Sequence, residues 1–335
     1  MRDRAGSTIL CDVPDVVLVT GGAGYVGSVV VEELLERGFE VRCLDALRHG
    51  NKASVEALAG RERFSFVAAD LRDPAARSAA LEGAWGVVHL AAIVGDPACS
   101  REPELAREVN LEATRALLAD AESAGVRRFL FASTCSNYGR IDSSAFATEE
   151  LPLNPISLYA ETKVEAELEV LDRASSTFAT TCLRLATVFG VSPRMRFDLT
   201  VNEFTRDALV GRHLVIYGEQ FWRPYVHVRD AARAVRLALE APAERVAGAV
   251  FNVGSTNENY RKLDLAEMLT ERFPETVVEF VERREDPRDY RVSFDKVRDG
   301  LGFVPDSSVP KGIDEVAGLL QSGAVADPYA DVYRN

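Results

Sequence analysis

A short glycine-rich segment, Thr-Gly-Gly-Ala-Gly-Tyr-Val-Gly at residues 20–27, constrains the fold more than any other feature of the sequence. It follows a short apolar run at residues 16–20 and precedes helical apolar spacing at residues 29–37. Its glycines at Gly21, Gly24 and Gly27 have the spacing GxxGxxG. Glycines in a strand–turn–helix unit let a phosphate approach the backbone amides at the start of a helix. The segment therefore predicts a phosphate-binding turn that opens an α/β domain.

The rest of the first half alternates strand and helix patterns, which predicts an α/β fold of the Rossmann type. Its parallel sheet is expected to be doubly wound, with helices on both faces. The strands are predicted at 16–20, 40–44, 64–68, 86–90, 128–132 and 179–185, and two long helices at 103–125 and 155–173.

After about Phe189 the regular alternation is lost, which predicts a smaller, mixed α/β C-terminal lobe that binds the substrate. We expect a dinucleotide-binding domain over residues 1–189 and the lobe over 190–335. Segments near 225–255 are expected to return to the first domain. Helices are predicted at 230–240 and 263–272, and strands at 250–253 and 277–281.

Acidic and small residues at the strand ends indicate which dinucleotide is bound. Asp45 ends the second strand, where a carboxylate accepts hydrogen bonds from ribose hydroxyls and repels a 2′-phosphate, so NAD is favoured over NADP. Arg48 lies close enough in sequence to weaken that preference. Asp70 and Leu71 follow the third strand, and an acid there reaches the adenine amino group. The small residues Leu90, Ala91 and Ala92 leave room for a flat cofactor.

Tyr159 and Lys163 are four residues apart, which places them on one face of a helix. A tyrosine has a pKa near 10 and is a poor base, but a neighbouring ammonium favours its phenolate. Such a tyrosine removes a hydroxyl proton while hydride leaves the carbon. Ser133 and Thr134 end the fifth strand, where ligands bind in parallel α/β sheets, and either hydroxyl is placed to bond the reacting oxygen.

These motifs together resemble the extended short-chain dehydrogenase/reductases, and within them the nucleotide-sugar epimerases and dehydratases. The resemblance runs from about residue 16 to about residue 313 and includes the glycine motif with Tyr25 and Val26. It implies an NAD cofactor and a nucleotide-diphosphate sugar substrate. It also implies that Tyr159 is the general acid/base, Lys163 its partner and the ligand of the nicotinamide ribose, and Thr134 the hydroxyl partner. Asn110 matches an asparagine that shapes the site in relatives.

The residues after Thr134 bear on the reaction. In related 4,6-dehydratases an Asp-Glu pair follows this hydroxyl residue and handles the elimination of water, whereas here Cys135 and Ser136 follow. This difference favours chemistry that needs only hydride and proton transfer. We expect a C4 epimerase that works through a 4-keto sugar, with a 4-keto-sugar reductase as the alternative. A dehydratase, a binding protein without catalysis, and a reductase of an apolar carbonyl compound fit the residues less well.

Arginines in the second half are the candidates for the diphosphate site, because a guanidinium bonds phosphate oxygens in pairs. Arg223 lies in the segment RPYVHVRD and resembles the family's clamp, and Arg288 is a second candidate. The other residues expected to bind substrate are Arg194, Arg196, Asn202, Ser133, Thr134, Cys135 and Ser136.

Charge and composition restrict the partners and the location. The net charge is −13, which argues against binding to nucleic acid or to an anionic membrane surface. No apolar run is long enough for a membrane span, and the first fifteen residues form a leader without the features of a signal peptide. The five scattered cysteines indicate reduced thiols in the cytoplasm and no metal site. The resemblance further implies a homodimer that packs through the two long helices.

Overall fold

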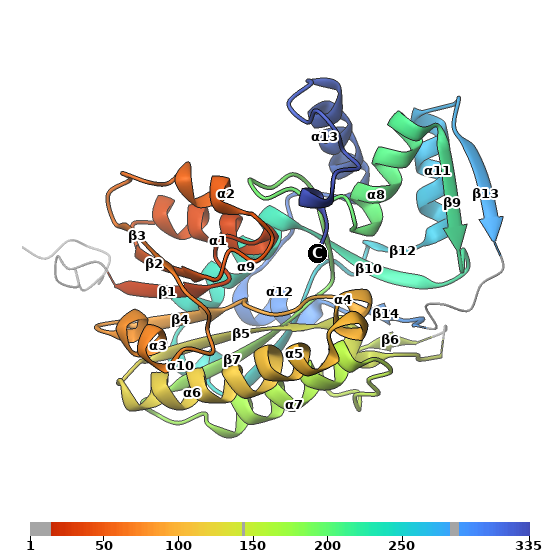
Figure 1. Cartoon of the computed structure of the whole chain (residues 1–335). Coiled ribbons are helices and arrows are strands. Elements are labelled where there is room, and N and C mark those ends of the chain that lie inside the picture. The colour runs from red at the N-terminus through yellow and green to blue at the C-terminus, as the bar shows by residue number, and fades with distance from the viewer. Residues whose placement is uncertain (1–14, 143–144, 282–287) are drawn as a thin grey trace, which may run out of the picture.

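The structure is a computed structural model that describes residues 15–142, 145–281 and 288–335. Most of the expected leader, together with Cys11, lies outside the described residues. A seven-stranded parallel sheet forms the centre of the larger part (Figure 1). Its order is β11-β7-β5-β4-β1-β2-β3. The strands are β1 (Val16–Thr20), β2 (Glu40–Asp45), β3 (Phe64–Ala68), β4 (Gly86–His89), β5 (Arg128–Thr134), β7 (Ala179–Leu185) and β11 (Ala249–Val253).

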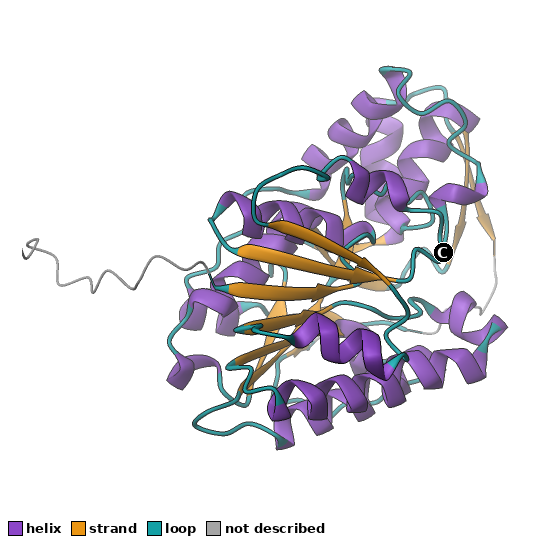
Figure 2. Ribbon diagram, turned by 60° about the vertical axis from the view of Figure 1, so that its left-hand side comes forward, coloured by secondary structure: helices purple, strands orange, loops and turns teal. Residues whose placement is uncertain are grey.

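Helices cover both faces of this sheet, so the doubly wound Rossmann-type fold is confirmed. Figure 2 shows the parallel strands lying between the helical layers. The helices α1 (Tyr25–Glu36) and α9 (Val228–Glu240) pack together on one face. The other face carries α3 (Pro74–Leu81), α6 (Ala113–Ser123) and α7 (Leu158–Asp172). Short helices in this part are α2 (Lys52–Glu56), α4 (Asp96–Arg101), α5 (Pro103–Arg107), α10 (Ala243–Val246) and α12 (Asp295–Leu301).

The helix predicted at 103–125 runs without a break from α5 to α6, but it contains a π-helical turn at Glu108–Glu112. π turns insert one residue into a helix and are frequent at functional sites. In this turn the side chain of Asn110 is fully buried. Its amide accepts a hydrogen bond from the Ile93 N–H at 2.7 Å and donates to the Ile93 carbonyl at 3.0 Å. The turn thus fixes the loop that follows β4.

The smaller lobe has its own apolar core, built from residues of both its helices and its strands. Its helices are α8 (Thr200–Arg206), α11 (Lys262–Arg272) and α13 (Val309–Gln321). Its strands are β8 (Thr187–Phe189), β9 (His213–Tyr217), β10 (Trp222–His227), β12 (Asn259–Arg261) and β13 (Val277–Val281), and a short pair joins β6 (Phe146–Ala147) to β14 (Arg291–Val292).

The chain passes back and forth between the two parts. After β8 it enters the smaller lobe, and β10 leads directly into α9, which lies on the large sheet. Arg236 of α9 is buried there and its guanidinium is 2.6 Å from the Glu33 carboxylate of α1. The strand β11 then pairs with β7 at the edge of the large sheet. The cleft between the parts lies at the carboxyl ends of the parallel strands, which is where ligands bind in this architecture.

Candidate active site

The glycine turn lies between β1 and α1, at the point where the strand order reverses. Gly21 has a φ of +72°, and a Cβ atom there would lie 2.7 Å from the Ala91 nitrogen. A Cβ atom on Gly27 would lie 2.0 Å from the Gly21 oxygen, so the third glycine permits the close packing of helix and turn. Gly24 precedes α1 and leaves the first-turn N–H groups without a side-chain cap. These groups suit a phosphate.

A cavity of about 200 Å³ extends from this turn along the ends of β1, β2 and β3. Asp45 is held at its wall, because its carboxylate accepts hydrogen bonds from the N–H groups of Ala23 at 3.1 Å and Leu47 at 2.8 Å. Burial raises the pKa of this carboxyl group. The cavity has the shape and chemistry for an adenosine diphosphate moiety. Its wall contains the predicted cofactor residues Gly21, Gly24, Tyr25, Val26, Gly27, Asp45, Asp70, Leu71, Leu90, Ala91 and Ala92.

Two arginines near this cavity are paired with acids. The Arg48 guanidinium is 2.5 Å from the Glu102 carboxylate, so the side chain expected to weaken the preference for NAD is engaged elsewhere. Asp70 forms an ion pair with Arg72 at 2.8 Å, and the hydrogen bond from Arg72 lowers the pKa of Asp70. An ionised Asp70 beside the cavity accepts hydrogen bonds.

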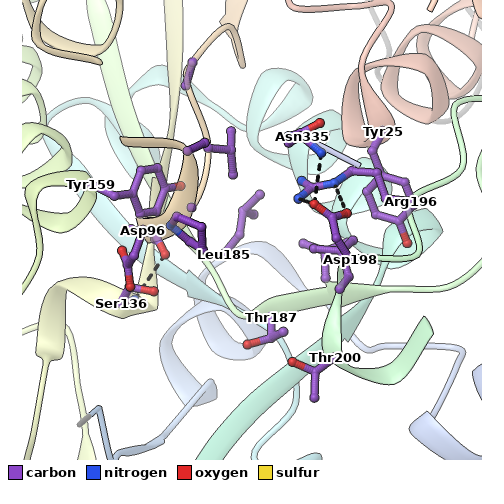
Figure 3. Close-up of a pocket in the computed structure, with 18 of the residues that line it drawn as sticks. Tyr25, Asp96, Ser136, Tyr159, Leu185, Thr187, Arg196, Asp198, Thr200 and Asn335 are labelled. Carbon is purple, nitrogen blue, oxygen red and sulfur yellow. Dashed lines mark hydrogen bonds and ion pairs between the residues drawn. The ribbon is translucent and has the colours of Figure 1, made fainter. Parts of the chain in front are cut away.

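A second, larger cavity of about 570 Å³ continues from the first toward the smaller lobe. Tyr159, Lys163 and Thr134 all line it, as the sequence predicts. Tyr159 and Lys163 lie one turn apart on α7, and the helix is capped by the Ser157 hydroxyl, which accepts from the Ala160 N–H at 3.3 Å. Thr134 ends β5. The same cavity is shown in Figure 3, where Tyr159, Asp96 and Ser136 lie on one side and Arg196 and Asp198 on the other.

Burial and nearby charges shift the pKa values of Tyr159 and Lys163 on α7. Burial raises the pKa of the Tyr159 phenol, and the nearby Cys99 and Asp96 add to this, whereas Arg196 and Arg288 oppose it. Burial also lowers the pKa of Lys163 to about 8. The Lys163 ammonium donates to the Ala132 carbonyl at 2.9 Å and lies 4.5 Å from the centre of the Phe131 ring. The Tyr159 phenol is therefore hard to deprotonate unless a positive charge lies beside it.

The predicted residues after β5 differ in what they contact. Ser133 lines the cavity, but its hydroxyl donates to the buried Glu167 carboxylate at 2.5 Å, and Glu167 forms an ion pair with Arg184. Ser136 also lines the cavity, and its hydroxyl accepts from Arg288 at 3.1 Å. These two serines are thus held by charged neighbours.

Three of the predicted site residues, Cys135, Asn202 and Asn110, do not line either cavity. Cys135 does not line the cleft, because its side chain is buried and its thiol donates to the Arg184 carbonyl at 3.2 Å. Asn202 is fully buried and bonds the backbone of Gly190 and Arg196. Asn110 holds the Ile93 backbone, as described above, and does not reach either cavity. Asn202 and Asn110 thereby support Arg196 and Ile93, which do line the cavities.

The four predicted arginines differ in the cavity that they line. Arg223 and Arg288 line the larger cavity, Arg194 lines the cofactor cavity, and Arg196 lines both. Arg196 forms a two-point ion pair with Asp198, at 2.8 and 2.7 Å. Arg288 lies 3.3 Å from the Asp96 carboxylate, and its carbonyl accepts from Arg223 at 2.5 Å.

Several residues of the cleft were not predicted from the sequence. Asp96 is the first residue of α4, directly after Gly95 in the loop that follows β4. For the others no short motif gave a signal, because distant segments bring them together. They are Thr187, Tyr290, Arg334 and Asn335.

Comparison with known proteins identifies the chain. The family model described as "NAD dependent epimerase/dehydratase family" matches residues 17–254. The chain belongs to this family. A relative from Corynebacterium glutamicum described as a UDP-glucose 4-epimerase is 30% identical over 324 residues, which cover 91% of this chain and 95% of that protein.

Solved structures of the family agree with the fold. The dTDP-glucose 4,6-dehydratase DesIV from Streptomyces venezuelae, with NAD bound, superimposes with a TM-score of 0.82 at 29% identity and covers 92% of this chain and 98% of its own. The UDP-glucose 4-epimerase from Thermus thermophilus in complex with NAD gives 0.80 at 29% identity, with 92% and 100% covered. The family assignment establishes the chain as an NAD-dependent enzyme, and the glycine turn with Asp45 fits that cofactor.

In the part of the chain that the structure describes, no helix has both the length and the apolar character of a membrane span. The described cysteines Cys43, Cys99, Cys135 and Cys182 are free and buried.

Proposed function

We propose that the protein is a nucleotide-diphosphate-sugar epimerase that inverts C4 through a 4-keto intermediate. The observation that supports this most directly is that Tyr159 and Thr134 line one cleft and that the two positions after Thr134 carry no acid. Cys135 is buried, and Ser136 is bonded to Arg288. The residues needed for proton and hydride transfer are therefore present, whereas the acid pair of the related dehydratases is missing.

Tyr159 and Lys163 supply the proton transfer in this proposal. The Tyr159 phenolate removes the proton of the C4 hydroxyl, and the Thr134 hydroxyl donates a hydrogen bond to the same oxygen. A charged Lys163, one helical turn away on α7, would lower the cost of forming the phenolate in a buried site. The glycine turn and Asp45 would hold NAD, which would supply the hydride acceptor and donor of the reaction. After the 4-keto sugar has rotated to present its other face, Tyr159 returns the proton to the C4 oxygen.

Three arginines that line the cleft are suited to the diphosphate and the sugar. Arg223 lies over the Tyr290 ring, and Arg288 lies beside Asp96 and Ser136 on the Tyr159 side. Arg196 lies on the other side of the cleft with Asp198. A guanidinium bonds phosphate oxygens in a fixed planar geometry, which would set the position of the sugar relative to Tyr159. UDP and dTDP sugars, the substrates named for the relatives, are the first to try.

The reaction is tested with a panel of UDP- and dTDP-hexoses and no added cofactor. We expect a mixture of C4 epimers, measured by NMR, because NAD is regenerated in each cycle. Turnover that depends on added NADPH and a 4-keto sugar would show a reductase and contradict the proposal. A 4-keto-6-deoxy product would show a dehydratase, with Asp96 as the acid that sequence motifs did not reveal.

Tyr159→Phe tests the catalytic assignment in the same assay. Loss of the general acid/base should lower kcat roughly 10²–10⁴-fold and leave NAD binding unchanged. Tyr217→Phe, at a half-exposed tyrosine away from the cleft, is the matched control and should behave as the unmodified protein. Full activity of Tyr159→Phe would exclude Tyr159 as the acid/base.

A further inference from the structure

The last residues of the chain lie in the cleft between the two parts. In Figure 1 the end of the chain is placed near the middle of the molecule, between α4 and the smaller lobe. Asn335 contributes to the wall of the cofactor cavity and of the larger cavity, and also of a third opening of about 330 Å³ beside Arg48 and Arg101. It therefore stands where the three openings meet.

This segment is held by contacts from the loop that carries Arg194 and Arg196. The Phe197 N–H donates to the Tyr333 carbonyl at 2.9 Å, and the two aromatic rings pack edge to face at 5.3 Å. The Arg194 guanidinium donates to the Arg334 carbonyl at 2.8 Å. The Asn335 N–H donates to the Asp198 carboxylate at 3.0 Å, as Figure 3 shows.

One contact joins the segment to the other part of the molecule. The Arg101 guanidinium of α4 donates to the Asn335 carbonyl oxygen at 3.0 Å. Residues 333–335 thus bridge the smaller lobe and the nucleotide-binding part. Several of their contacts involve backbone atoms, so the short sequence of the segment gave no signal for them.

The position of the bridge has a consequence for the dinucleotide. A molecule that extends from Asp45 to Tyr159 must pass through the part common to both cavities. The residues shared by the two cavity walls are Tyr25, Val26, Leu90, Ala92, Val94, Arg196 and Asn335. The first turn of α1 on one side, and Arg196 with Asn335 on the other, would therefore flank the pyrophosphate of such a molecule.

We propose that residues 333–335 form a strap across the bound NAD, so that the cofactor enters and leaves only when the strap is released. The ties to Phe197, Arg194, Asp198 and Arg101 keep the strap closed. This inference rests on the binding of NAD and is independent of which sugar is converted. It explains how a cofactor that must survive both half-reactions of an epimerase is retained between them.

The test measures binding of NADH, by its fluorescence, in the absence of any sugar. Release is followed by adding excess NAD to protein loaded with NADH, and association by mixing in a stopped-flow instrument. The test variant is a triple deletion that lacks Tyr333, Arg334 and Asn335, because the four hydrogen bonds end on backbone atoms of these residues. A second variant, Arg101→Ala, removes only the tie to α4. The matched control is Val332→Ala, which alters a half-exposed side chain in the same segment.

A strap slows passage in both directions, so the triple variant should both bind and release NADH roughly tenfold faster. Arg101→Ala should shift both rates in the same direction by a smaller factor, and Val332→Ala should change neither. Unaltered rates in the triple variant would overturn the proposal. Faster release with unaltered association would overturn it too, because it would show an ordinary contact with the bound cofactor. Since no sugar is present, neither result depends on the proposed epimerase reaction.

Discussion

At the scale of single residues, opposing charges around Tyr159 set the conditions under which it acts as a base. Burial raises the pKa of the phenol, and Cys99 and Asp96 raise it further, whereas Arg196 and Arg288 lower it. Asp96 also partly neutralises Arg288, 3.3 Å away, and accepts a hydrogen bond from Ser157 at 2.6 Å. One carboxylate thus reduces the fraction of phenolate at neutral pH in two ways.

The variant Asp96→Asn should shift the pH dependence of the reaction. Removing this negative charge stabilises the phenolate, so the pKa of Tyr159 falls and the base form exists at lower pH. The acidic limb of kcat/KM against pH should move down by about 1 pH unit, whereas the exposed control Glu104→Gln should not move it. A limb that stays in place, or moves up, would mean that Asp96 does not influence the essential base.

At the scale of elements, Gly24 and Gly27 at the first turn of α1 have different roles. Gly27 provides space for the packing of helix on turn, since an added Cβ would lie 2.0 Å from the Gly21 oxygen. Gly24 lines the cofactor cavity, and an added Cβ would meet only the Gly21 oxygen, at 3.1 Å. Gly27 is therefore needed for the packing of the protein, and Gly24 for the binding of the ligand.

Alanine at each position should separate these roles. Gly27→Ala should lower the free energy of unfolding by about 3 kcal/mol, measured with urea, because backbone atoms must move apart. Gly24→Ala should unfold like the unmodified protein and bind NADH about tenfold more weakly. Gly318→Ala, at an open site on α13, is the control and should change little. Equal effects of Gly24→Ala and Gly27→Ala on unfolding would contradict this division.

Elements with a regular pattern were predictable from the sequence, and those defined by distant contacts were not. The strands β1, β3 and β7 have the predicted bounds, and β1 shows the clearest signal because it is a buried apolar run. The pairing of Tyr159 with Lys163 followed from helical spacing. The π-helical turn at Asn110 depends on hydrogen bonds to Ile93, and the place of Asn335 depends on Phe197 and Asp198. Neither leaves a local pattern in the sequence.

At the scale of the whole molecule, α6 and α7 form an outer helical layer, and the resemblance to the family led us to expect a dimer through it. The Leu168 side chain on α7 is 59% exposed. Exposed apolar side chains of this kind suit a symmetric interface.

Leu168→Glu should therefore convert a dimer into a monomer, because two like charges would face each other in the contact. Sedimentation velocity measures the change. Val304→Glu, at a valine that is 62% exposed on another side of the molecule, should leave the assembly intact. A protein that sediments as a monomer without substitution, or a Leu168→Glu variant that remains a dimer, would rule out this interface.

The place of β11 at the edge of the large sheet has a consequence for biosynthesis. When β7 has emerged from the ribosome, its outer edge has no neighbour, since β11 follows only after much of the smaller lobe has been translated. The helix α9, which covers α1, emerges in the same interval. The nascent chain therefore presents an open strand edge and an apolar helical surface at once, and this is the stage at which chaperones would protect it from aggregation.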